Sequence, residues 1–467
     1  MKPFELSAFP GQTLVEKVVS HLAKAVESGQ LAPGAKLPSI RDFAGTNGIS
    51  KSTVVEAYDR LVARGLVTAR SKSGFYAAAR RPVLEIAKSE ASADRPVDEF
   101  WMLRNSLNLP ADALRPGCGW LPSAYLDESQ IRRVLGALKS DRAESLTEYG
   151  HPAGCRELRV QLQRHLAERE IEAGADRILL TDSGSQGLDL GIRLLVQPGD
   201  AVVVDDPCYF NFRASLKAHR VDVLGVPLTP AGPDMEAFEK IVARHRPRLY
   251  ITNSVLQNPT GISFSPSVVH QILVLTEKYD FSVIEDDTFA DFDEGKATRL
   301  ASLDPLGRVI YVGSFSKTLS GAIRCGFVAA KPEWIEAMTD LKLATTYGNN
   351  ELSARLIYRL LADGSYRKHM ESIRQRLRRL REPVKARLEA CGLAPWGLPG
   401  ASPFLWMEAP EGNDTSAIAQ AALREGILLA PGNVFSVSNT AGRFLRFNTA
   451  HTQDPRLFEF LRSAIRG

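Results

Sequence analysis

Residues 39–61, SIRDFAGTNGISKSTVVEAYDRL, decide the fold of the amino-terminal part of this chain. Ser39 is placed to cap a short helix that Gly48 ends, and Ser50 is placed to cap a second helix that Gly65 closes. The second helix carries apolar side chains at helical spacing, at Val54, Tyr58, Leu61 and Val62. Two such helices joined by a short turn predict a helix-turn-helix.

The flanking segments extend this pair into a larger unit. Thr13 and Glu16 form a capping box at the start of an amphipathic helix that ends at Gly29. After the last helix, residues 66–68 and 75–77 are short β-rich runs on either side of a basic turn. We therefore predict a third helix in front of the helix-turn-helix and a β-hairpin wing behind it.

The basic charge of the chain is concentrated in this unit. The net charge of all 467 residues is only +4, but the first 80 residues carry 11 Lys and Arg against 6 Asp and Glu. A local basic excess beside a helix amino terminus rich in hydroxyls favours contact with DNA phosphates and base edges. The alternative is a three-helix interaction module whose charges are only solvated. The side chains placed for DNA contact are Arg41, Ser50, Lys51, Ser52, Thr53 and, on the hairpin, Lys72.

These motifs resemble the winged-helix domain of the GntR family of bacterial transcription regulators. The resemblance spans about residues 12–78 and includes Leu37-Pro38-Ser39-Ile40-Arg41, Gly48-Ile49-Ser50-Lys51-Ser52-Thr53-Val54 and Ala57-Tyr58-Asp59-Arg60-Leu61. It implies a DNA-binding domain over residues 1–78, with DNA contacts at Arg41, Ser50, Lys51, Ser52, Thr53, Lys72 and Gly74. Residues 79–98 lose the helical periodicity and mix Ala, Arg, Pro, Ser and Glu, which predicts a linker.

The rest of the chain, residues 99–467, alternates short β-rich runs with longer helical patterns. Such alternation predicts an α/β domain with a mostly parallel sheet, whose ligands gather at the carboxyl ends of the strands. No Gly-x-Gly-x-x-Gly or Walker loop follows any of the runs, which argues against nucleotide binding. The runs are Ile178–Leu180, Ala201–Val204, Val221–Leu224, Leu249–Thr252, Ser282–Ile284 and Val309–Val312.

Two polar motifs follow predicted strands and suit an anionic aldehyde. Ser314-Phe315-Ser316-Lys317 flanks a lysine with hydroxyls seven residues before Arg324, so Lys317 can form an imine while its neighbours bind a phosphate. Ser183-Gly184-Ser185-Gln186-Gly187 precedes a helix and offers free N–H groups to an anion. Taken singly, each has a plainer explanation, a surface lysine and a common Gly/Ser turn.

Three further residues suit the same cofactor. Asp286 at a strand end can bond a protonated pyridine nitrogen, and Asn258 in a turn can donate to a phenolate oxygen. Tyr209 can lie against the face of an aromatic ring. Alone, these residues could cap a turn, form an ordinary β-turn or pack in a core. Their joint presence in this order favours one shared site.

Together the motifs resemble the fold-type I aminotransferases, which bind pyridoxal 5′-phosphate, over about residues 101–467. The resemblance implies that Lys317 is the Schiff-base lysine, that Asp286 and Asn258 bind the ring nitrogen and ring oxygen, and that Tyr209 stacks on the ring. It places the phosphate at Gly184, Ser185, Gln186, Ser314, Ser316 and Arg324.

The same resemblance implies two further roles. Tyr149 matches a tyrosine that reaches the phosphate of the neighbouring subunit, so a homodimer is implied. Arg446 matches an arginine that binds a substrate carboxylate, with Arg443 as a close competitor. One position departs from the family pattern, because Phe289 stands where many of these enzymes have a tyrosine on the ring oxygen. Thr288 can substitute only in part, and we expect catalysis to suffer more than cofactor binding.

A GntR-type winged helix joined by a linker to an aminotransferase-like domain is the architecture of the MocR subfamily, which the chain resembles over nearly its whole length. The resemblance implies a regulator that binds double-stranded operator DNA and senses a small amino compound through aldimine exchange at Lys317. It also implies a homodimer, which can be domain-swapped. The alternative is a catalytically active aminotransferase with an appended DNA-binding domain, and a third reading is a DNA-binding protein with an empty pocket.

Composition argues against other classes of protein. Five scattered cysteines with no Cys-x-x-Cys pair indicate neither a zinc site nor a disulfide framework, and no metal is expected. No apolar run approaches the length of about 18 residues that a membrane span needs, and the start lacks a signal-peptide core, so a cytoplasmic protein is expected. The arginines between residues 374 and 381 are interpreted as a solvated helix face, with a second DNA contact as the alternative.

Overall fold

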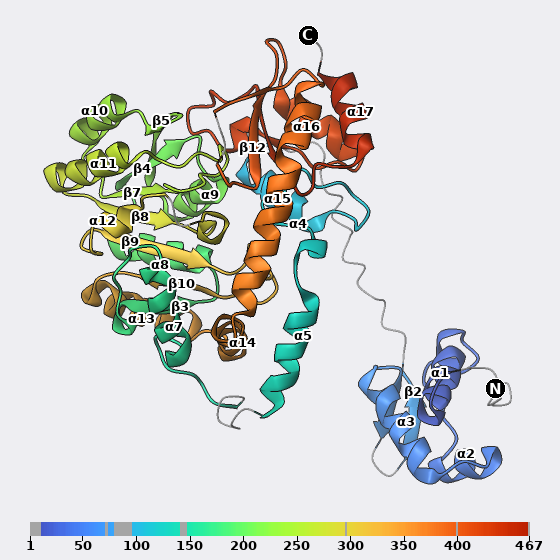
Figure 1. Ribbon diagram of the computed structural model, residues 1–467. Helices are drawn as coiled ribbons and strands as arrows, with labels where there is room; N and C mark the ends of the chain where they lie inside the picture. The colour runs from blue at the N-terminus through green and yellow to red at the C-terminus, as the bar shows by residue number, and fades with distance from the viewer. Residues whose placement is uncertain are drawn as a thin grey trace. The chain divides into compact units, whose positions relative to one another are not determined.

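The computed structural model describes residues 11–70, 73–78, 96–140, 147–294, 297–397 and 400–465 (Figure 1). The chain divides into two compact units, Met1–Ser92 and Ala93–Gly467. Lys72 and most of the predicted linker, residues 79–98, lie outside the described residues.

The amino-terminal unit consists of three helices and a hairpin, as the sequence predicts. The side chain of Thr13 and that of Glu16 complete the capping box of the first helix. Ser39 and Ser50 cap the next two helices, and Gly48 ends the second one with a left-handed φ of 62°. The elements are α1 (Leu14–Glu27), α2 (Ile40–Asn47), α3 (Lys51–Ala63), β1 (Val67–Arg70) and β2 (Gly74–Ala77).

Tyr58 on α3 connects the helices of this unit to its hairpin. Its side chain is fully buried, and its hydroxyl donates to the carbonyl oxygen of Pro38 at 2.9 Å. Its ring packs edge-on against Phe43 of α2 and Phe75 of β2, with centroid distances of 6.2 and 4.9 Å. The antiparallel strands β1 and β2 therefore form a wing whose position is fixed by the helical core.

The second unit is built on an eight-stranded sheet in the order β3-β10-β9-β8-β7-β4-β5-β6. Strands β5, β4, β7, β8 and β9 run parallel, whereas β10 is antiparallel to both of its neighbours. The sequence analysis did not anticipate β10. The strands are β3 (Ile178–Thr181), β4 (Ala201–Asp206), β5 (Asp222–Thr229), β6 (Gly232–Pro233), β7 (Leu249–Thr252), β8 (Ser282–Asp286), β9 (Val309–Ser314) and β10 (Gly326–Ala329).

Helices cover both faces of this sheet (Figure 1). Successive residues of β4 belong to different cores, because side chains alternate across a strand: Val202 and Val204 pack with one core and Val203 with the other. The α-helices of this unit are α4 (Glu99–Asn108), α5 (Glu128–Ala137), α7 (Arg156–Ala167), α8 (Gly184–Leu195), α9 (Phe210–His219), α10 (Met235–His245), α11 (Pro266–Tyr279), α12 (Leu300–Leu303), α13 (Pro332–Thr346), α14 (Glu351–Ala362), α15 (Ser365–Glu389), α16 (Thr415–Arg424) and α17 (Pro455–Ala464).

A smaller antiparallel sheet, in the order β11-β12-β14-β13, packs with its own apolar core near the carboxyl terminus. The sequence analysis predicted only the large sheet, and two of these strands are just two residues long, too short to give a pattern. The strands are β11 (Ala394–Pro395), β12 (Phe404–Glu408), β13 (Ala430–Pro431) and β14 (Phe444–Asn448).

The described residues contain no helix that is both long and apolar enough to cross a membrane. Within the same part of the chain, no group of His, Cys, Asp and Glu is arranged to hold a metal ion. The five cysteines are all buried and unpaired.

Candidate functional site

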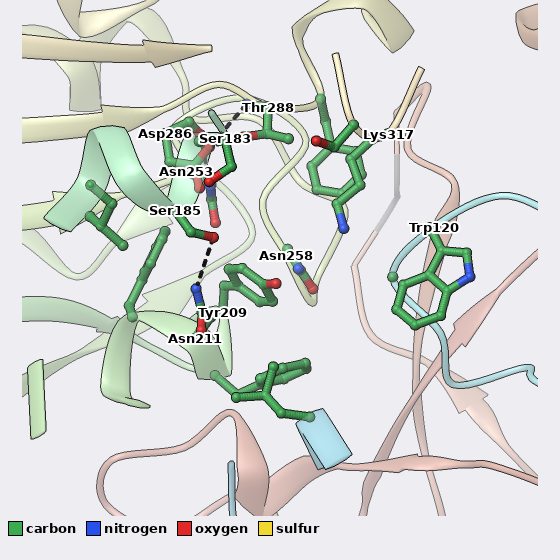
Figure 2. A pocket seen from close by; sticks show the side chains of 18 of the residues that line it. Trp120, Ser183, Ser185, Tyr209, Asn211, Asn253, Asn258, Asp286, Thr288 and Lys317 are labelled. Atoms are coloured by element: carbon green, nitrogen blue, oxygen red, sulfur yellow. Dashed lines mark hydrogen bonds between the residues drawn. The ribbon is translucent and has the colours of Figure 1, made fainter. Parts of the chain in front are cut away.

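The side chains singled out in the second unit converge at the carboxyl ends of parallel strands. β8 ends at Asp286, β9 ends just before Lys317, and β4 ends just before Tyr209. Parallel strands bring these ends to one edge of the sheet. Together with the amino terminus of α8, the three residues line one cavity (Figure 2).

Lys317 lies partly buried in the turn after β9, with Nζ 5.8 Å from the centroid of the Trp120 ring. Burial and the nearby cation of Arg446 lower the pKa of the Lys317 amine to about 8, although Asp286 opposes the shift. About a tenth of this amine is therefore the free base at pH 7, far more than for an ordinary lysine, and only the free base can add to a carbonyl group. Lys317 is thus poised to act as a nucleophile.

Asp286 is fixed in position by its neighbours on both sides of the strand end. Its Oδ1 accepts from the backbone nitrogen of Thr288 at 3.0 Å and from the Thr288 hydroxyl, and its carbonyl oxygen accepts from Asn253 Nδ2 at 2.7 Å. Burial raises the pKa of this carboxyl, while the bonds from Thr288 act in the opposite direction. The second carboxylate oxygen has no hydrogen bond among the described residues, so it can accept one from a protonated ring nitrogen.

The amino terminus of α8 forms another wall of the cavity. Ser183 caps this helix, accepting from Gln186 N at 3.1 Å, and Gly184 and Ser185 also line the wall. A Cβ atom on Gly184 would lie 3.2 Å from the Thr288 hydroxyl, so a side chain there would crowd the space in front of the helix. Free backbone N–H groups at a helix amino terminus bind anions.

Two more groups at this wall suit an anion. The Ser316 hydroxyl is buried and has no hydrogen-bond partner among the described residues. Arg324 also lines the cavity and is exposed to solvent on its other side. Buried polar atoms in proteins are normally hydrogen-bonded, so an orphaned hydroxyl beside a cation indicates a missing acceptor such as a phosphate.

Asn258 and Arg446 come from distant parts of the chain and bind each other directly. Arg446 Nη1 donates to Asn258 Oδ1 at 2.7 Å, and Nη2 donates to the carbonyl oxygen of Gly117 at 2.5 Å. Because its oxygen is taken by the arginine, the amide of Asn258 presents its NH2 group to other partners. The cis peptide bond between Asn258 and Pro259 belongs to the turn that carries this side chain.

Arg446 is a fully buried cation that has no carboxylate partner among the described residues. Its Nε is buried without a hydrogen bond. Burial lowers the pKa of its guanidinium to about 10, so it stays charged at neutral pH. The competitor Arg443 instead pairs with Glu408. A buried, uncompensated arginine is suited to bind the carboxylate of a ligand.

Four of the predicted site residues do not line the cavity, and the fully buried Arg446 is one of them. The side chain of Gln186 is held by the backbone of Asp182 and by Thr346. Ser314 lies next to the cavity, where its hydroxyl accepts from Ser316 N at 3.2 Å. Tyr149 is 84% exposed, and its ring packs against that of Tyr347 at 4.8 Å.

The cavity also has lining residues that the sequence analysis missed. Gly119 and Trp120 come from a loop early in the second unit, and Met102, Leu103 and Ser106 come from α4. These residues follow no predicted strand, so no local pattern marks them. Phe289, in contrast, was singled out in advance and lines the cavity, where its phenyl ring packs against Phe404.

Tyr209 lies at the amino terminus of α9 and also lines the cavity. Its ring contacts those of Phe210 and Phe212, with centroid distances of 4.8 and 5.6 Å. Burial raises the pKa of its hydroxyl to about 12, so this residue is a neutral aromatic surface near physiological pH.

These groups fit pyridoxal 5′-phosphate. Lys317 supplies the amine for its aldehyde, and Asp286 supplies the carboxylate for its ring nitrogen. The orphaned Ser316 hydroxyl and the amino terminus of α8 supply donors for its phosphate. Tyr209 supplies an aromatic surface for its ring.

The amino-terminal unit carries the second candidate site, at the start of α3. Ser50, Lys51 and Ser52 are exposed and Thr53 is partly exposed, while Arg41 is exposed on the first turn of α2. The Ser50 hydroxyl also bonds those of Ser52 and Thr53, at 2.9 and 2.7 Å. On the wing, Gly74 is exposed with a φ of 106°. These groups lie at the amino termini of α2 and α3 and on one hairpin, the arrangement with which winged helices contact DNA.

Fold and site together define a two-domain protein, a winged helix-turn-helix joined to a pyridoxal phosphate-binding domain of fold type I. The chain belongs to the aminotransferase class I and II family, whose model matches residues 121–463, and residues 14–77 match the gntR family of bacterial regulatory proteins. This fused architecture is MocR-like, as the sequence analysis expected.

Known proteins with similar chains share one or both parts. The HTH-type transcriptional regulator YdcR of Escherichia coli is 29% identical, with 93% of this chain and 94% of that protein covered. The HTH-type transcriptional regulator YdfD of Bacillus subtilis is 26% identical, with 95% of each covered. The structure of LysN, an α-aminoadipate aminotransferase from Thermus thermophilus complexed with N-(5′-phosphopyridoxyl)-L-leucine, is 25% identical. It covers 78% of this chain and 92% of its own, with a TM-score of 0.68.

Proposed function

We propose that this protein is a DNA-binding transcription regulator whose larger domain senses a small amine by means of pyridoxal 5′-phosphate. One observation carries the proposal: a gntR-type domain is joined in one chain to a cavity lined by Lys317 and Asp286, and the uncompensated Arg446 lies behind its wall, bonded to Asn258. Similarity to proteins named as transcriptional regulators over more than nine-tenths of the chain supports it. Binding to chromosomal DNA would place the protein in the cytoplasm.

Pyridoxal 5′-phosphate supplies an aldehyde that condenses reversibly with primary amines. In the proposed mechanism Lys317 would hold the cofactor until the ligand amine takes its place, and Arg446 would bind the carboxylate of that ligand. Because the pKa of Lys317 is lowered to about 8, its amine can be free of a proton when released. Asp286 and the donors at α8 keep the cofactor in place throughout.

Ligand binding regulates DNA binding only if the ligand has unequal affinity for two arrangements of the protein. Displacement of Lys317 changes the contacts of this side chain with Trp120, which comes from another segment of the domain. We propose that such local changes favour one arrangement of the two domains and thereby alter the affinity for operator DNA.

We further propose a homodimer. Tyr149 and Tyr347 pack against each other, and the two residues are 84% and 63% exposed. Two adjacent aromatic rings exposed to water form an apolar patch of the kind that marks interaction surfaces. A partner subunit would cover these rings and would bring its own Tyr149 towards the cofactor phosphate.

A second candidate function is transamination, and it is favoured by the complete set of Lys317, Asp286 and Arg446. Phe289 argues against efficient turnover, because its ring cannot donate a hydrogen bond to the ring oxygen of the cofactor. Thr288 has a hydroxyl, but it is engaged with Asp286. We therefore rank regulation above catalysis.

The experiment that tests the proposal combines spectroscopy with DNA binding. Purified protein should be yellow, and an amine that changes its visible absorption should also change its affinity for the DNA upstream of its own gene. Steady turnover of an amino acid with a keto acid at ordinary enzyme rates, without any effect on DNA binding, would favour the second candidate. A colourless protein that contains no cofactor would refute the sensing mechanism.

A further inference from the structure

We propose that the ligand of the cavity is an amine with a single carboxylate and an otherwise apolar body, and that α4 forms the wall against which this body packs. The inference rests on the proposed function, because it concerns the ligand of the same cavity. The chemistry of the ligand is inferred from the polar groups of the cavity that remain free once those assigned to the cofactor are set aside.

The charged side chains that line the cavity are few. Among the described residues they are Asp286, Lys317 and Arg324, each of which has a partner on the cofactor. Arg446 does not line the cavity itself but lies behind Gly119, where a Cβ would be 3.7 and 3.8 Å from its two Nη atoms, and we assign it to one carboxylate. No further cation or anion among the described lining residues remains for the side chain of a ligand.

Most of the neutral polar side chains away from the phosphate donors make hydrogen bonds with the protein, although Asn253 Oδ1 has no partner among the described residues. Asn211 Nδ2 donates to the Ser185 hydroxyl at 3.3 Å, and Asn253 Nδ2 donates to the carbonyl oxygen of Asp286 at 2.7 Å. The Ser106 hydroxyl donates to the carbonyl oxygen of Leu103 at 2.9 Å, within α4 itself. Ser106 therefore adds little polarity to the wall in which it lies.

The remaining wall is apolar, and besides Leu188, Phe212 and Phe289 it includes side chains from the start of the second unit. α4 contributes Met102 and Leu103, the following loop contributes Trp120, and α9 contributes Phe210. Figure 2 shows the ring of Trp120 apart from the polar side chains around Asp286. An apolar ligand body replaces water against such surfaces favourably, whereas a second charge would be buried there without a partner.

α4 also has a place in the chain that suits regulation. It begins at Glu99, directly after the predicted linker, and among the described residues it is the first element that follows the DNA-binding domain in sequence. Glu99 is itself buried and lies 3.5 Å from Lys217 on α9, so α4 is attached to a second wall of the cavity.

The test is a spectral titration of the full-length, cofactor-loaded protein with L-leucine, L-phenylalanine, L-glutamate and L-lysine. L-leucine or L-phenylalanine should change the visible absorption band at concentrations at least tenfold lower than either charged amino acid. If L-glutamate or L-lysine acts at equal or lower concentrations, the inference is overturned but the proposed function stands. If none of these nor any other primary amine changes the band of a yellow protein, the proposed function fails as well.

Variants of α4 identify the wall. Leu103→Arg should shift the preference from L-leucine towards L-glutamate by at least tenfold, because it adds a cation to an apolar surface. The matched control is Leu107→Arg, one turn further along α4, where Leu107 is 76% exposed and does not line the cavity. The control should retain the wild-type preference.

A milder substitution at the same position tests the assignment even if Leu103→Arg prevents folding. Leu103→Ala should weaken the response to L-leucine at least threefold and leave the response to L-alanine within twofold. An unchanged response to L-leucine in Leu103→Ala, or equal effects of the two arginine variants, would refute the assignment of this wall to α4.

Discussion

Arg446→Lys should weaken ligand binding strongly, although it keeps a positive charge at the same place. The guanidinium has five N–H groups. Two of these N–H groups donate to Asn258 and Gly117, at 2.7 and 2.5 Å. The remaining N–H groups, among them that of the unpartnered Nε, are available to a ligand carboxylate. A lysine offers a point charge in place of this planar fork, so at least one charge-assisted hydrogen bond is lost.

The magnitude follows from that lost bond. A hydrogen bond to a charged group contributes about 1.5–3 kcal/mol, which corresponds to a ligand affinity about 10- to 150-fold weaker. Burial adds a dependence on pH. Burial lowers the pKa of the partly buried Lys317 and of the fully buried Lys342 to about 8, and a lysine in place of Arg446 should behave similarly.

The sign of the pH effect is therefore clear. An introduced lysine loses its charge as the pH rises through about 8, whereas Arg446, with a pKa of about 10, keeps its charge. The ratio of variant to wild-type dissociation constants should increase further, by up to about tenfold, between pH 7 and pH 9.

Spectral titration with L-leucine at both pH values measures this ratio, because the wild type corrects for the titration of the other groups. The matched control is Arg443→Lys, since Arg443 is partly exposed and pairs with Glu408 away from the cavity. It should change the affinity less than about twofold, as expected for a partly exposed ion pair. Equal affinities of Arg446→Lys and the wild type at both pH values would refute the assignment of Arg446 to the carboxylate.

Three further predictions address the cofactor, the DNA surface and the core. Lys317→Ala should abolish the visible absorption band without changing the circular dichroism spectrum, and a retained band would contradict its role. Lys51→Ala should weaken operator binding and reduce the slope of log affinity against log salt concentration by about 0.9. Lys24→Ala on α1 should leave both the affinity and the slope unchanged. Equal slopes for Lys51→Ala and the wild type would exclude a phosphate contact at Lys51. Arg299→Met should destabilise the second unit by about 3–5 kcal/mol, because it leaves the buried carboxylate of Asp287, now 2.5 Å from Arg299 Nε, without its cation. Denaturation followed by tryptophan fluorescence measures this loss, since all five tryptophans lie in that unit, and a loss below about 1 kcal/mol would be inconsistent with the buried pair.

The local parts of the fold were predictable because their signals are local. Ser39, Gly48 and Ser50 stop and start helices through contacts with residues at most four positions away, so the sequence contains the whole interaction. Asp286 and Lys317 were found by the same logic, because each follows directly on a buried strand.

Features that depend on distant segments escaped prediction. The two-residue strands β11 and β13 exist only because β12 and β14 offer them backbone partners. Likewise, α4 lines the cavity through packing with residues more than 100 positions away, which no periodicity encodes.

The arginines of α15 also show that contacts with distant segments escape prediction from the sequence. The interpretation as a solvated face was wrong for Arg374, Arg376 and Arg381, which donate to backbone carbonyl oxygens of other segments at 2.9 Å each. Arg378 and Arg379 are exposed, as that interpretation expected. Helical periodicity identifies a polar face, but it does not say which other segment covers it.

The sequence by itself determined the two-domain architecture, the helix caps, most strands of the large sheet and the chemical groups at their ends. These depend on side-chain periodicity and on contacts within one turn of chain. Only the tertiary structure distinguishes Arg446 from Arg443, because Arg446 is buried and bonded to Asn258 whereas Arg443 pairs with Glu408. It also showed that the cavity has an apolar wall from α4 and Trp120, since burial and pairing are properties of the folded chain and not of any local segment.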